Sequence, residues 1–417
     1  MLTADQLLDA LLERARGVTE TETVSITDAL GRVLAAPQTS AITVPPLDNS
    51  AMDGYAVRAA DVVVAGVRLP VSQRILAGAV GAPLQPGTAA RIFTGAPVPP
   101  GADAVLMQEY CTPLPNPLPQ AGEGANAMPK PINEGESVVI NKLPQPGENI
   151  RRAGEDIEAG GQVLAAGTRI GAAEMGLAAS VGLAALPVFK RLKVACFFTG
   201  DELVTPGTAL RPGQIYNSNR YLLAGLLKSL GCELTDFGIV PDSLEATKAA
   251  LEGAASIADV VITSGGVSVG EADYVKAAVE KLGRVEMWKV AMKPGKPLVY
   301  GRVNDADFIG LPGTPVSAFV TFCLFGRPFL LKRMGVADVL YRAFAMQADF
   351  AWNKAGARRE FLRVKIQADG RLALFPNQGS GVLTSCAWAD GLVDLGVGQT
   401  VHPGDWVRFI PFSELLS

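Results

Sequence analysis

DVVITSGGVSVGEADYVK, residues 259–276, is the stretch that decides the fold. It opens with the β-branched run VVIT, passes through Gly265 and Gly266, and continues into an amphipathic run that ends in YVK. A buried strand that leads through a glycine turn into a helix is the repeating unit of a parallel α/β sheet. The stretch therefore predicts one such strand, turn and helix.

The same alternation extends on both sides of this stretch. β-branched runs such as KVACFF, CELTDFGIV and DFIGLPG alternate with runs that have the apolar spacing of helices. Right-handed crossovers place the loops that follow the strands at one edge of such a sheet, where ligands bind. We therefore predict a central, doubly wound α/β domain over residues 186–332, with a ligand site at the carboxyl edge of a parallel sheet.

The flanking regions predict a multidomain protein of α/β plus β class. Residues 1–44 and 146–185 are expected to form one discontinuous helical and β domain, with helix over most of the first 40 residues. Residues 45–145 have the short apolar runs and the turn residues of a β-rich domain. Residues 112–131 repeat PLP without hydrophobic period, which predicts a low-complexity insertion. Alternating strands over 335–417 predict a small C-terminal β-barrel.

Composition and charge exclude several partners and locations. The chain has 417 residues and a net charge of −4, which gives no overall reason to expect nucleic acid or an anionic membrane as partner. The longest uncharged run in the middle of the chain, residues 175–189, is shorter than the roughly 20 residues that a membrane span needs. The opening MLTADQLLDALLERA is acidic and amphipathic, unlike a secretory signal. We expect a cytoplasmic protein.

The cysteines and the single histidine limit the possible chemistry. The five cysteines are widely spaced and form no CxxC pair, so we expect small core residues and no disulfide framework or structural zinc site. His402, the one histidine, stands in a predicted turn, so a Ser-His-Asp triad or a multi-histidine metal site is not expected. The chemistry must rest on carboxylates, cationic side chains and backbone amides.

The glycine loop of the opening stretch has two possible explanations. Glycines let backbone N–H groups approach an oxyanion, and hydroxyls and a helix amino terminus strengthen such a site. A tight turn that needs positive φ would require the same glycines. The loop matches neither the dinucleotide nor the P-loop fingerprint. Its candidate binding residues are Ser264, Gly265, Gly266, Ser268 and Gly270.

Three carboxylates follow predicted elements at the same edge. Asp273 stands in the first turn of the predicted helix, where it either caps the helix or helps to hold Mg²⁺ beside a phosphate. Glu202 belongs to TGDEL after one strand, and Asp242 follows the strand that ends in GIV. An isolated acidic residue in a loop is more often simply solvated.

A short loop concentrates positive charge. WKVAMKPGKP contains Lys289, Lys293 and Lys296, with Pro and Gly restricting the backbone. These lysines either remain solvated surface charges or, on a stiff loop near the glycine turn, attract a dianion.

Six motifs, in order along the chain, are similar to those of the molybdopterin molybdenumtransferase (MoeA) family of molybdenum cofactor biosynthesis. The motifs are DNSAMDGYAV (48–57), FTGAPVPPGADAV (93–105), NIRRAGEDI (149–157), TGDEL (199–203), TSGGVSVGEADYVK (263–276) and KPGKP (293–297). The resemblance implies a molybdopterin-binding-like central domain, a four-domain subunit and an elongated homodimer with sites between subunits.

The resemblance also implies a metal-binding transferase that inserts molybdenum. Adenylylated molybdopterin and molybdate would react with release of AMP, with Mg²⁺ as the divalent ion and molybdopterin adenylyltransferase as a possible partner. The implied catalytic residues are Asp53, Asp242, Asp273, Lys289 and Lys293. With the glycine loop, the implied substrate-binding residues are Thr94, Arg151, Asp156, Glu202, Lys296 and Ser380. Asp242, Asp273 and Glu202 are the expected metal ligands. Lys289, Lys293 and Arg151 are expected to meet the anions.

Three other functions remain open at this point. A related domain occurs in molybdopterin adenylyltransferases, although the appended domains and the KPGKP loop argue against that reaction. Competence-damage proteins use a similar domain for pyridine-nucleotide chemistry, but DNSAMDGYAV would then have no explanation. A non-enzymatic scaffold is the third alternative, because eukaryotic proteins that carry this set of domains in a fused form serve to anchor receptors.

Overall fold

The structure is a computed structural model that describes residues 1–114, 136–267 and 274–416, without the side chains of residues 287 and 288. Most of the predicted insertion lies outside these residues, as do the predicted site residues Ser268, Gly270 and Asp273.

Contacts divide the chain into two compact units. The larger unit comprises Met1–Ala36, Ala166–Met175 and Ala185–Ser417, and the smaller unit comprises Pro37–Ala165 and Gly176–Ala184. This division is coarser than the four predicted domains, whose boundaries stay a prediction.

The larger unit contains the predicted α/β sheet, in the strand order β16-β13-β17-β21-β20-β18. β16, β13, β17 and β21 pair in parallel, whereas β20 pairs antiparallel with both of its neighbours. The strands are β13 (Lys193–Thr199), β16 (Glu233–Val240), β17 (Val260–Ser264), β18 (Gly283–Lys289), β20 (Pro297–Val303) and β21 (Ala306–Leu311).

The four strands predicted from the sequence are thus parallel, as expected, and the sheet continues in two strands, β20 and β18, that were not predicted. Only Asn304 and Asp305 separate β20 from β21, and Asn304 has a φ of 53°. A two-residue turn with positive φ forces two strands into an antiparallel hairpin, because a parallel crossover needs a dozen or more residues.

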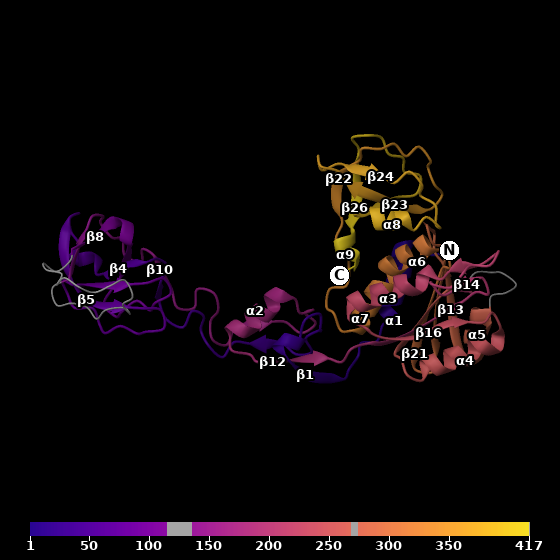
Figure 1. Cartoon of the computed structure of the whole chain (residues 1–417), viewed down its shortest axis with the longest axis horizontal. Helices are drawn as coiled ribbons and strands as arrows, with labels where there is room; N and C mark the ends of the chain where they lie inside the picture. Colours follow the sequence, from indigo (N-terminus) through magenta and orange to yellow (C-terminus); the bar gives the residue numbers. More distant parts are fainter. Residues whose placement is uncertain (115–135, 268–273, 417) are drawn as a thin grey trace. The chain divides into compact units, whose positions relative to one another are not determined.

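Helices cover both faces of this sheet, as a doubly wound domain requires. Along β13, Val194 and Phe198 belong to one apolar core together with residues of α3, whereas Phe197 belongs to a second core with residues of α4 and α5. Figure 1 shows α3 and α4 among the helices around β13. These helices are α3 (Ser218–Leu230), α4 (Leu244–Ala255), α5 (Tyr274–Leu282), α6 (Pro315–Thr321) and α7 (Arg327–Arg333), with a π-helical turn, Phe322–Gly326, between the last two.

The continuous helical run Pro315–Arg333 is long and apolar enough to cross a membrane by length and composition. Since 89% of its most apolar window is buried inside the protein, it has the character of a core helix.

The amino-terminal helix is shorter than predicted. α1 (Ala4–Arg14) begins at a capping box made by Thr3 and Gln6 and buries Leu7 and Leu11. β1 (Thr21–Ser25) then pairs with β12 (Ala185–Phe189), because the run TETVS is β-branched and suits a strand better than a helix. A second helix, α2 (Ala172–Ser180), precedes β12 in the chain.

The last part of the chain forms the predicted small barrel. β22 (Phe344–Gln347), β23 (Arg359–Ile366), β24 (Leu372–Leu374), β25 (Gly391–Leu395) and β26 (Trp406–Pro411) are its strands, and α8 (Thr384–Trp388) and α9 (Phe412–Leu416) are its helices. The strands pair in the order β24-β23-β25-β26-β22, and a bridge between Ala348 and Leu372 closes the barrel. β19 (Met292–Lys293), from the lysine loop, extends this sheet by pairing with β23.

The smaller unit is rich in β structure, as predicted. Its main sheet has the order β7-β4-β6-β5-β9-β8. The strands are β4 (Gly54–Val57), β5 (Val67–Ile75), β6 (Ala89–Ile92), β7 (Ala104–Met107), β8 (Cys111–Leu114) and β9 (Ser137–Ile140). Two short ladders join β2 (Gln38–Thr39) to β11 (Gln162–Leu164) and β3 (Asn49–Ser50) to β10 (Ile150–Arg151). Residues 112–114, expected in the insertion, belong to β8.

All five cysteines are free and buried, which confirms their assignment to the core.

Candidate active site

A buried hydrogen-bond network joins three segments at the carboxyl edge of the central sheet. Ser264 ends β17 and donates its hydroxyl to the carbonyl oxygen of Pro312 at 2.8 Å. Asn219, in the first turn of α3, donates its side-chain amide to Ser264 Oγ at 2.8 Å and to the carbonyl oxygen of Gly313 at 2.7 Å. The loop after β17, the loop after β21 and the start of α3 are thereby fixed to one another.

The glycines after Ser264 satisfy a steric requirement. Gly265 and Gly266 have φ values of +98° and +64°, which side chains rarely adopt. A Cβ on Gly266 would lie 2.6 Å from Val275 Cγ2 and 2.9 Å from Thr199 Oγ1. The tight-turn explanation therefore holds. The proposed oxyanion role of Gly265, Gly266 and Ser264 stays a prediction.

A small pocket of about 90 Å³ opens beside this network. Its lining includes Glu202 from TGDEL, Ser264 and Gly265, together with Thr199, Asn217 and Asn219. Among the described residues, Thr199 Oγ1, Asn217 Nδ2 and Asn219 Oδ1 are buried polar atoms without a hydrogen-bond partner. A buried polar group left unpaired destabilises a fold by about 1–3 kcal/mol. A polar ligand in the pocket would remove part of that penalty.

The candidate metal ligands lie on neighbouring loops. Asp201 Oδ1 accepts a hydrogen bond from the backbone N–H of Asp242 at 3.2 Å, so TGDEL and the loop after β16 meet. Glu202 and Asp242 both follow strands of the sheet at its carboxyl edge. Within the described ranges, no three His, Cys, Asp or Glu residues gather in a metal-binding group. Asp273 lies outside those ranges, and the metal assignment stays a prediction.

The lysine loop has a constrained backbone. The N–H of Val290 donates to the carbonyl oxygen of Lys296 at 3.0 Å and closes the loop. Gly295 has a φ of +92°, and a Cβ there would lie 2.4 Å from Thr321 Oγ1. Lys293 and Lys296 are exposed on this frame. The sequence-based expectation of a stiff cationic loop is correct in its geometry.

The C-terminal barrel contributes to the same region. Lys293 Nζ lies 3.3 Å from Oε1 of Glu360, a buried residue of β23. The carbonyl oxygen of Ser380 accepts a hydrogen bond from the N–H of Val316 in the first turn of α6 at 3.0 Å. Ser380 therefore lies next to the start of α6, and its role in binding substrate stays a prediction. Lys289 ends β18 at this edge and is exposed.

Two residues of this region were missed by sequence reasoning. Arg363 is 1% exposed and donates to Ser385 Oγ and to the carbonyl oxygen of Gly379, next to Ser380. Burial lowers the pKa of its guanidinium. Glu360 faces Lys293 from the same strand. An Arg and a Glu in REFLRVKI look like ordinary strand surface residues, so no local signal identifies them.

The smaller unit brings two predicted residues together. Asp53 Oδ1 accepts hydrogen bonds from the backbone N–H of Thr94 at 2.8 Å and from Thr94 Oγ1 at 2.7 Å. These bonds, with a weaker contribution from Arg91, hold the pKa of Asp53 below its ordinary value. Asp53 is thus kept ionised and exposed to solvent.

The other two predicted residues of this unit are exposed on a neighbouring segment. Arg151 lies in β10, paired with Asn49 of β3, and Asp156 lies in the turn that follows. This segment is held by Asp48, whose carboxylate accepts from Arg152 Nη1 at 2.6 Å and from the N–H of Ala153 at 2.8 Å. The anchoring pair Asp48 and Arg152 was not singled out from the sequence.

A doubly wound domain with glycines, hydroxyls, lysines and carboxylates at the carboxyl edge of its sheet defines a class of α/β proteins that bind anionic ligands there. Comparison with known families narrows this class. Residues 2–182 match the MoeA N-terminal region (domain I and II), residues 195–332 match a probable molybdopterin binding domain, and residues 345–412 match the MoeA C-terminal region (domain IV).

Individual relatives cover the whole chain. The molybdopterin molybdenumtransferase of Haemophilus influenzae is 39% identical over 100% of both chains, and that of Nostoc sp. is 38% identical over 91% of this chain and 86% of its own. The crystal structure of the molybdopterin biosynthesis moeA protein from Pyrococcus horikoshii has a TM-score of 0.74 at 33% identity, over 99% of both chains. The chain therefore belongs to the MoeA family.

Substitution of Thr94 by Val tests the coupling to Asp53. The variant loses the hydroxyl donor but keeps the backbone donor, so the pKa of Asp53 should rise part of the way toward its ordinary value of 3.8. Because the folded-state pKa of Asp53 is depressed, its hydrogen bonds with Thr94 stabilise the fold at pH values above the ordinary pKa of 3.8. This stabilisation is lost as the pH falls through the folded-state pKa. Carboxyl chemical shifts in a pH titration measure the change. Thr88→Val is the control, because it removes a hydroxyl that donates to the carbonyl oxygen of Gln85. Equal Asp53 titrations in the original chain and in both variants would contradict the coupling.

Proposed function

We propose that this chain is a molybdopterin molybdenumtransferase that inserts molybdenum from molybdate into adenylylated molybdopterin and releases AMP. The observation that carries the proposal is the match to relatives of that name at 38–39% identity, over 89–100% of this chain. The match to MoeA regions on both sides of the central domain favours this function over the adenylyltransferase, competence-damage and scaffold alternatives.

The cationic loop and Ser380 suit the binding of molybdate. Molybdate is a tetrahedral dianion, and exposed lysine ammonium groups on a fixed backbone attract such an ion. Lys293 and Lys296 lie at the two ends of the Pro-Gly turn, and Glu360 restrains Lys293 from the barrel side. The hydroxyl-lined pocket near Ser264 suits the phosphate of the adenylyl group, with Glu202 at its rim.

Magnesium is the divalent ion that we propose for this reaction. Carboxylate oxygens are the donors that Mg²⁺ prefers, and Glu202, Asp242 and Asp273 would hold it at the carboxyl edge, where Asp201 and Asp242 already meet. The ion would withdraw charge from the phosphoanhydride whose cleavage releases AMP. In the smaller unit, we propose that Asp53, kept ionised by Thr94, and the exposed Arg151 and Asp156 also act in this reaction.

We propose a cytoplasmic homodimer that receives its substrate from a molybdopterin adenylyltransferase. Membership of the MoeA family supports this proposal.

Replacement of Lys293 by Ala should lower the rate of AMP release from adenylylated molybdopterin at limiting molybdate by about tenfold to a hundredfold, as expected for one charge-assisted contact to a dianion. Lys354→Ala, which removes an exposed lysine of the barrel, should have no effect. Equal rates for the Lys293 variant and the original chain would refute the assignment.

The same assay separates the proposed reaction from its nearest alternative. Incubation of the original chain with ATP and unmodified molybdopterin should give no adenylylated product, whereas adenylylated molybdopterin with molybdate should give AMP. The opposite pair of results would identify an adenylyltransferase.

The metal assignment predicts a specific shift for Asp242→Asn. Loss of one carboxylate ligand should raise the Mg²⁺ concentration for half-maximal AMP release by about tenfold or more. Asp369→Asn, an exposed turn residue of the barrel, serves as the matched control. If chelation of divalent ions leaves AMP release unchanged, the proposed metal is not needed.

A further inference from the structure

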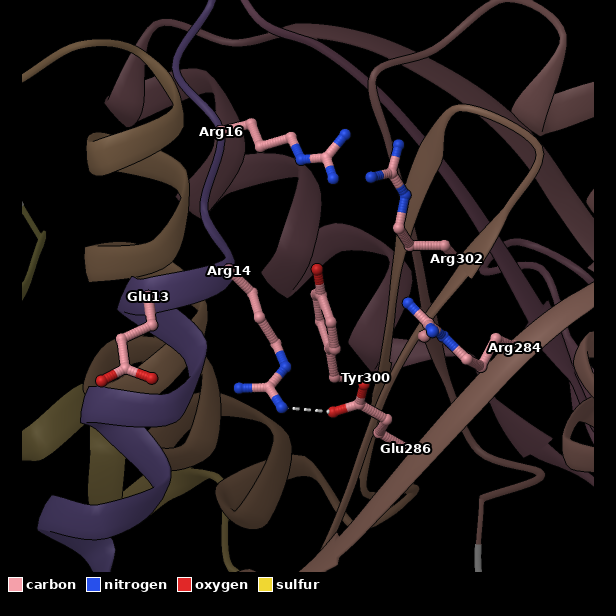
Figure 2. A pocket seen from close by; sticks show the side chains of 8 residues that line it. Glu13, Arg14, Arg16, Arg284, Glu286, Tyr300 and Arg302 are labelled. Atoms are coloured by element: carbon pink, nitrogen blue, oxygen red, sulfur yellow. Dashed lines mark ion pairs between the residues drawn. The ribbon is translucent and has the colours of Figure 1, made fainter.

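A second pocket in the larger unit gathers arginines at the opposite edge of the central sheet. Its volume is about 220 Å³, and Figure 2 shows the side chains around it. The lining residues come from the end of α1 and the segment after it, and from β18 and β20: Glu13, Arg14, Arg16, Arg284, Glu286, Tyr300, Gly301 and Arg302.

Strand direction separates this pocket from the candidate active site. β18 runs in the same direction as β21, since each pairs antiparallel with β20. Lys289 therefore ends β18 at the carboxyl edge of the sheet, whereas Arg284 lies near its start. The five steps along the extended strand from Arg284 to Lys289 span roughly 17 Å. None of the residues predicted for molybdenum insertion lines the arginine pocket.

The positive charge of the pocket is not compensated by its own acids. Arg14 forms an ion pair with Glu286 at 2.8 Å, and Figure 2 shows the Glu13 carboxylate pointing away from the arginines. In the part of the chain that the structure describes, neither Arg16 nor Arg284 forms an ion pair. Arg302 donates to the carbonyl oxygen of Asp305 at 3.0 Å, which leaves its charge unbalanced.

The charges around Tyr300 in this pocket already balance one another. The hydroxyl of Tyr300 donates to Asp307 Oδ1 at 2.7 Å, and Arg333 pairs with the other oxygen of this buried carboxylate. Asp307 also acts electrostatically on Arg16 and Arg302, but its charge is shared with Arg333. The pocket therefore retains an excess of positive charge.

The arrangement of the arginines is unfavourable without a ligand. Arg284 and Arg302 are directly opposite each other in the β18–β20 ladder, a position in which like charges destabilise a sheet. Figure 2 shows the guanidinium groups of Arg16 and Arg302 pointing toward one another. An anion with several oxygens, placed between these groups, would convert repulsion into charge-assisted hydrogen bonds.

We propose that this pocket binds a phosphate group, held by Arg16, Arg284 and Arg302. A dianion matches the excess charge, and guanidinium groups bind phosphate oxygens in a bidentate manner. The volume is below the roughly 300 Å³ of pockets that enclose larger ligands. The ligand is therefore inorganic phosphate or the phosphate end of a phosphomonoester whose remainder stays in solvent.

Calorimetric titration of the full chain with inorganic phosphate, at constant ionic strength set with chloride, tests the proposal. Binding should be saturable, with a Kd of about 1 mM or tighter. The double variant R284Q/R302Q should bind at least about a hundredfold more weakly, because two charge-assisted contacts are lost. R342Q, which changes an exposed arginine outside the pocket, should bind as the original chain does.

A second arm identifies the source of the phosphate and checks folding. Glycerol phosphate that binds more tightly than inorganic phosphate would indicate a phosphomonoester, and the reverse order would indicate the free ion. In buffer without phosphate, R284Q should unfold at the same temperature as the original chain or higher, because one repulsive pair is gone. The proposal is overturned if the original chain shows no saturable binding of either compound, or if the double variant binds phosphate as tightly as R342Q.

Discussion

The hydrogen bonds of Asn219 to Ser264 and Gly313 hold together the edge of the sheet on which the candidate site depends. They attach the start of α3 to the loops after β17 and β21, which the hydrogen bond from Ser264 to Pro312 already joins. Asn219 and Ser264 are buried, and an amide that donates to two partners at 2.7–2.8 Å leaves little freedom for rearrangement. The positive φ values of Gly265 and Gly266 then direct the chain around this point.

The second structural constraint is the attachment of the lysine loop to the barrel. β19 pairs with β23, Lys293 meets Glu360, and Val316 binds Ser380 through the backbone. Cationic groups on a flexible loop would lose conformational entropy on binding a small anion, whereas a loop closed by hydrogen bonds has lost much of it already. The barrel therefore acts as a rigid support for the part of the site proposed to bind molybdate.

The sequence predicts much of the architecture and only part of the site. β13, β16, β17 and β21 were predictable because β-branched runs between amphipathic helices have one common explanation. β18 and β20 were not predicted, and the Asn304–Asp305 turn was the available signal for the antiparallel pairing of β20 with β21. The helix predicted to continue toward residue 40 ends at Arg14, because local β propensity and pairing with β12 determine the segment that follows.

The residues that support the site were harder to predict than the residues at its surface. Gly265, Gly266 and the KPGKP lysines stand out in the sequence as paired glycines after a strand and as clustered charge, although each pattern also has a purely structural explanation. From the sequence alone, Asn219 looks like an ordinary polar residue at the start of a helix, and Arg363 looks like a surface residue of a strand. Their roles depend on contacts between segments distant in sequence, such as the 94 positions between Asn219 and Gly313.

The central claim is that the carboxyl edge of the α/β sheet, with the lysine loop, binds the anions of the molybdenum insertion reaction. A crystal structure of the protein with AMP and molybdate bound tests it most directly. The account predicts the AMP phosphate beside Ser264, Gly265 and Gly266, and molybdate within reach of Lys293 and Lys296. Crystals in which both ligands bind elsewhere, with this edge empty or filled by protein side chains, would contradict it.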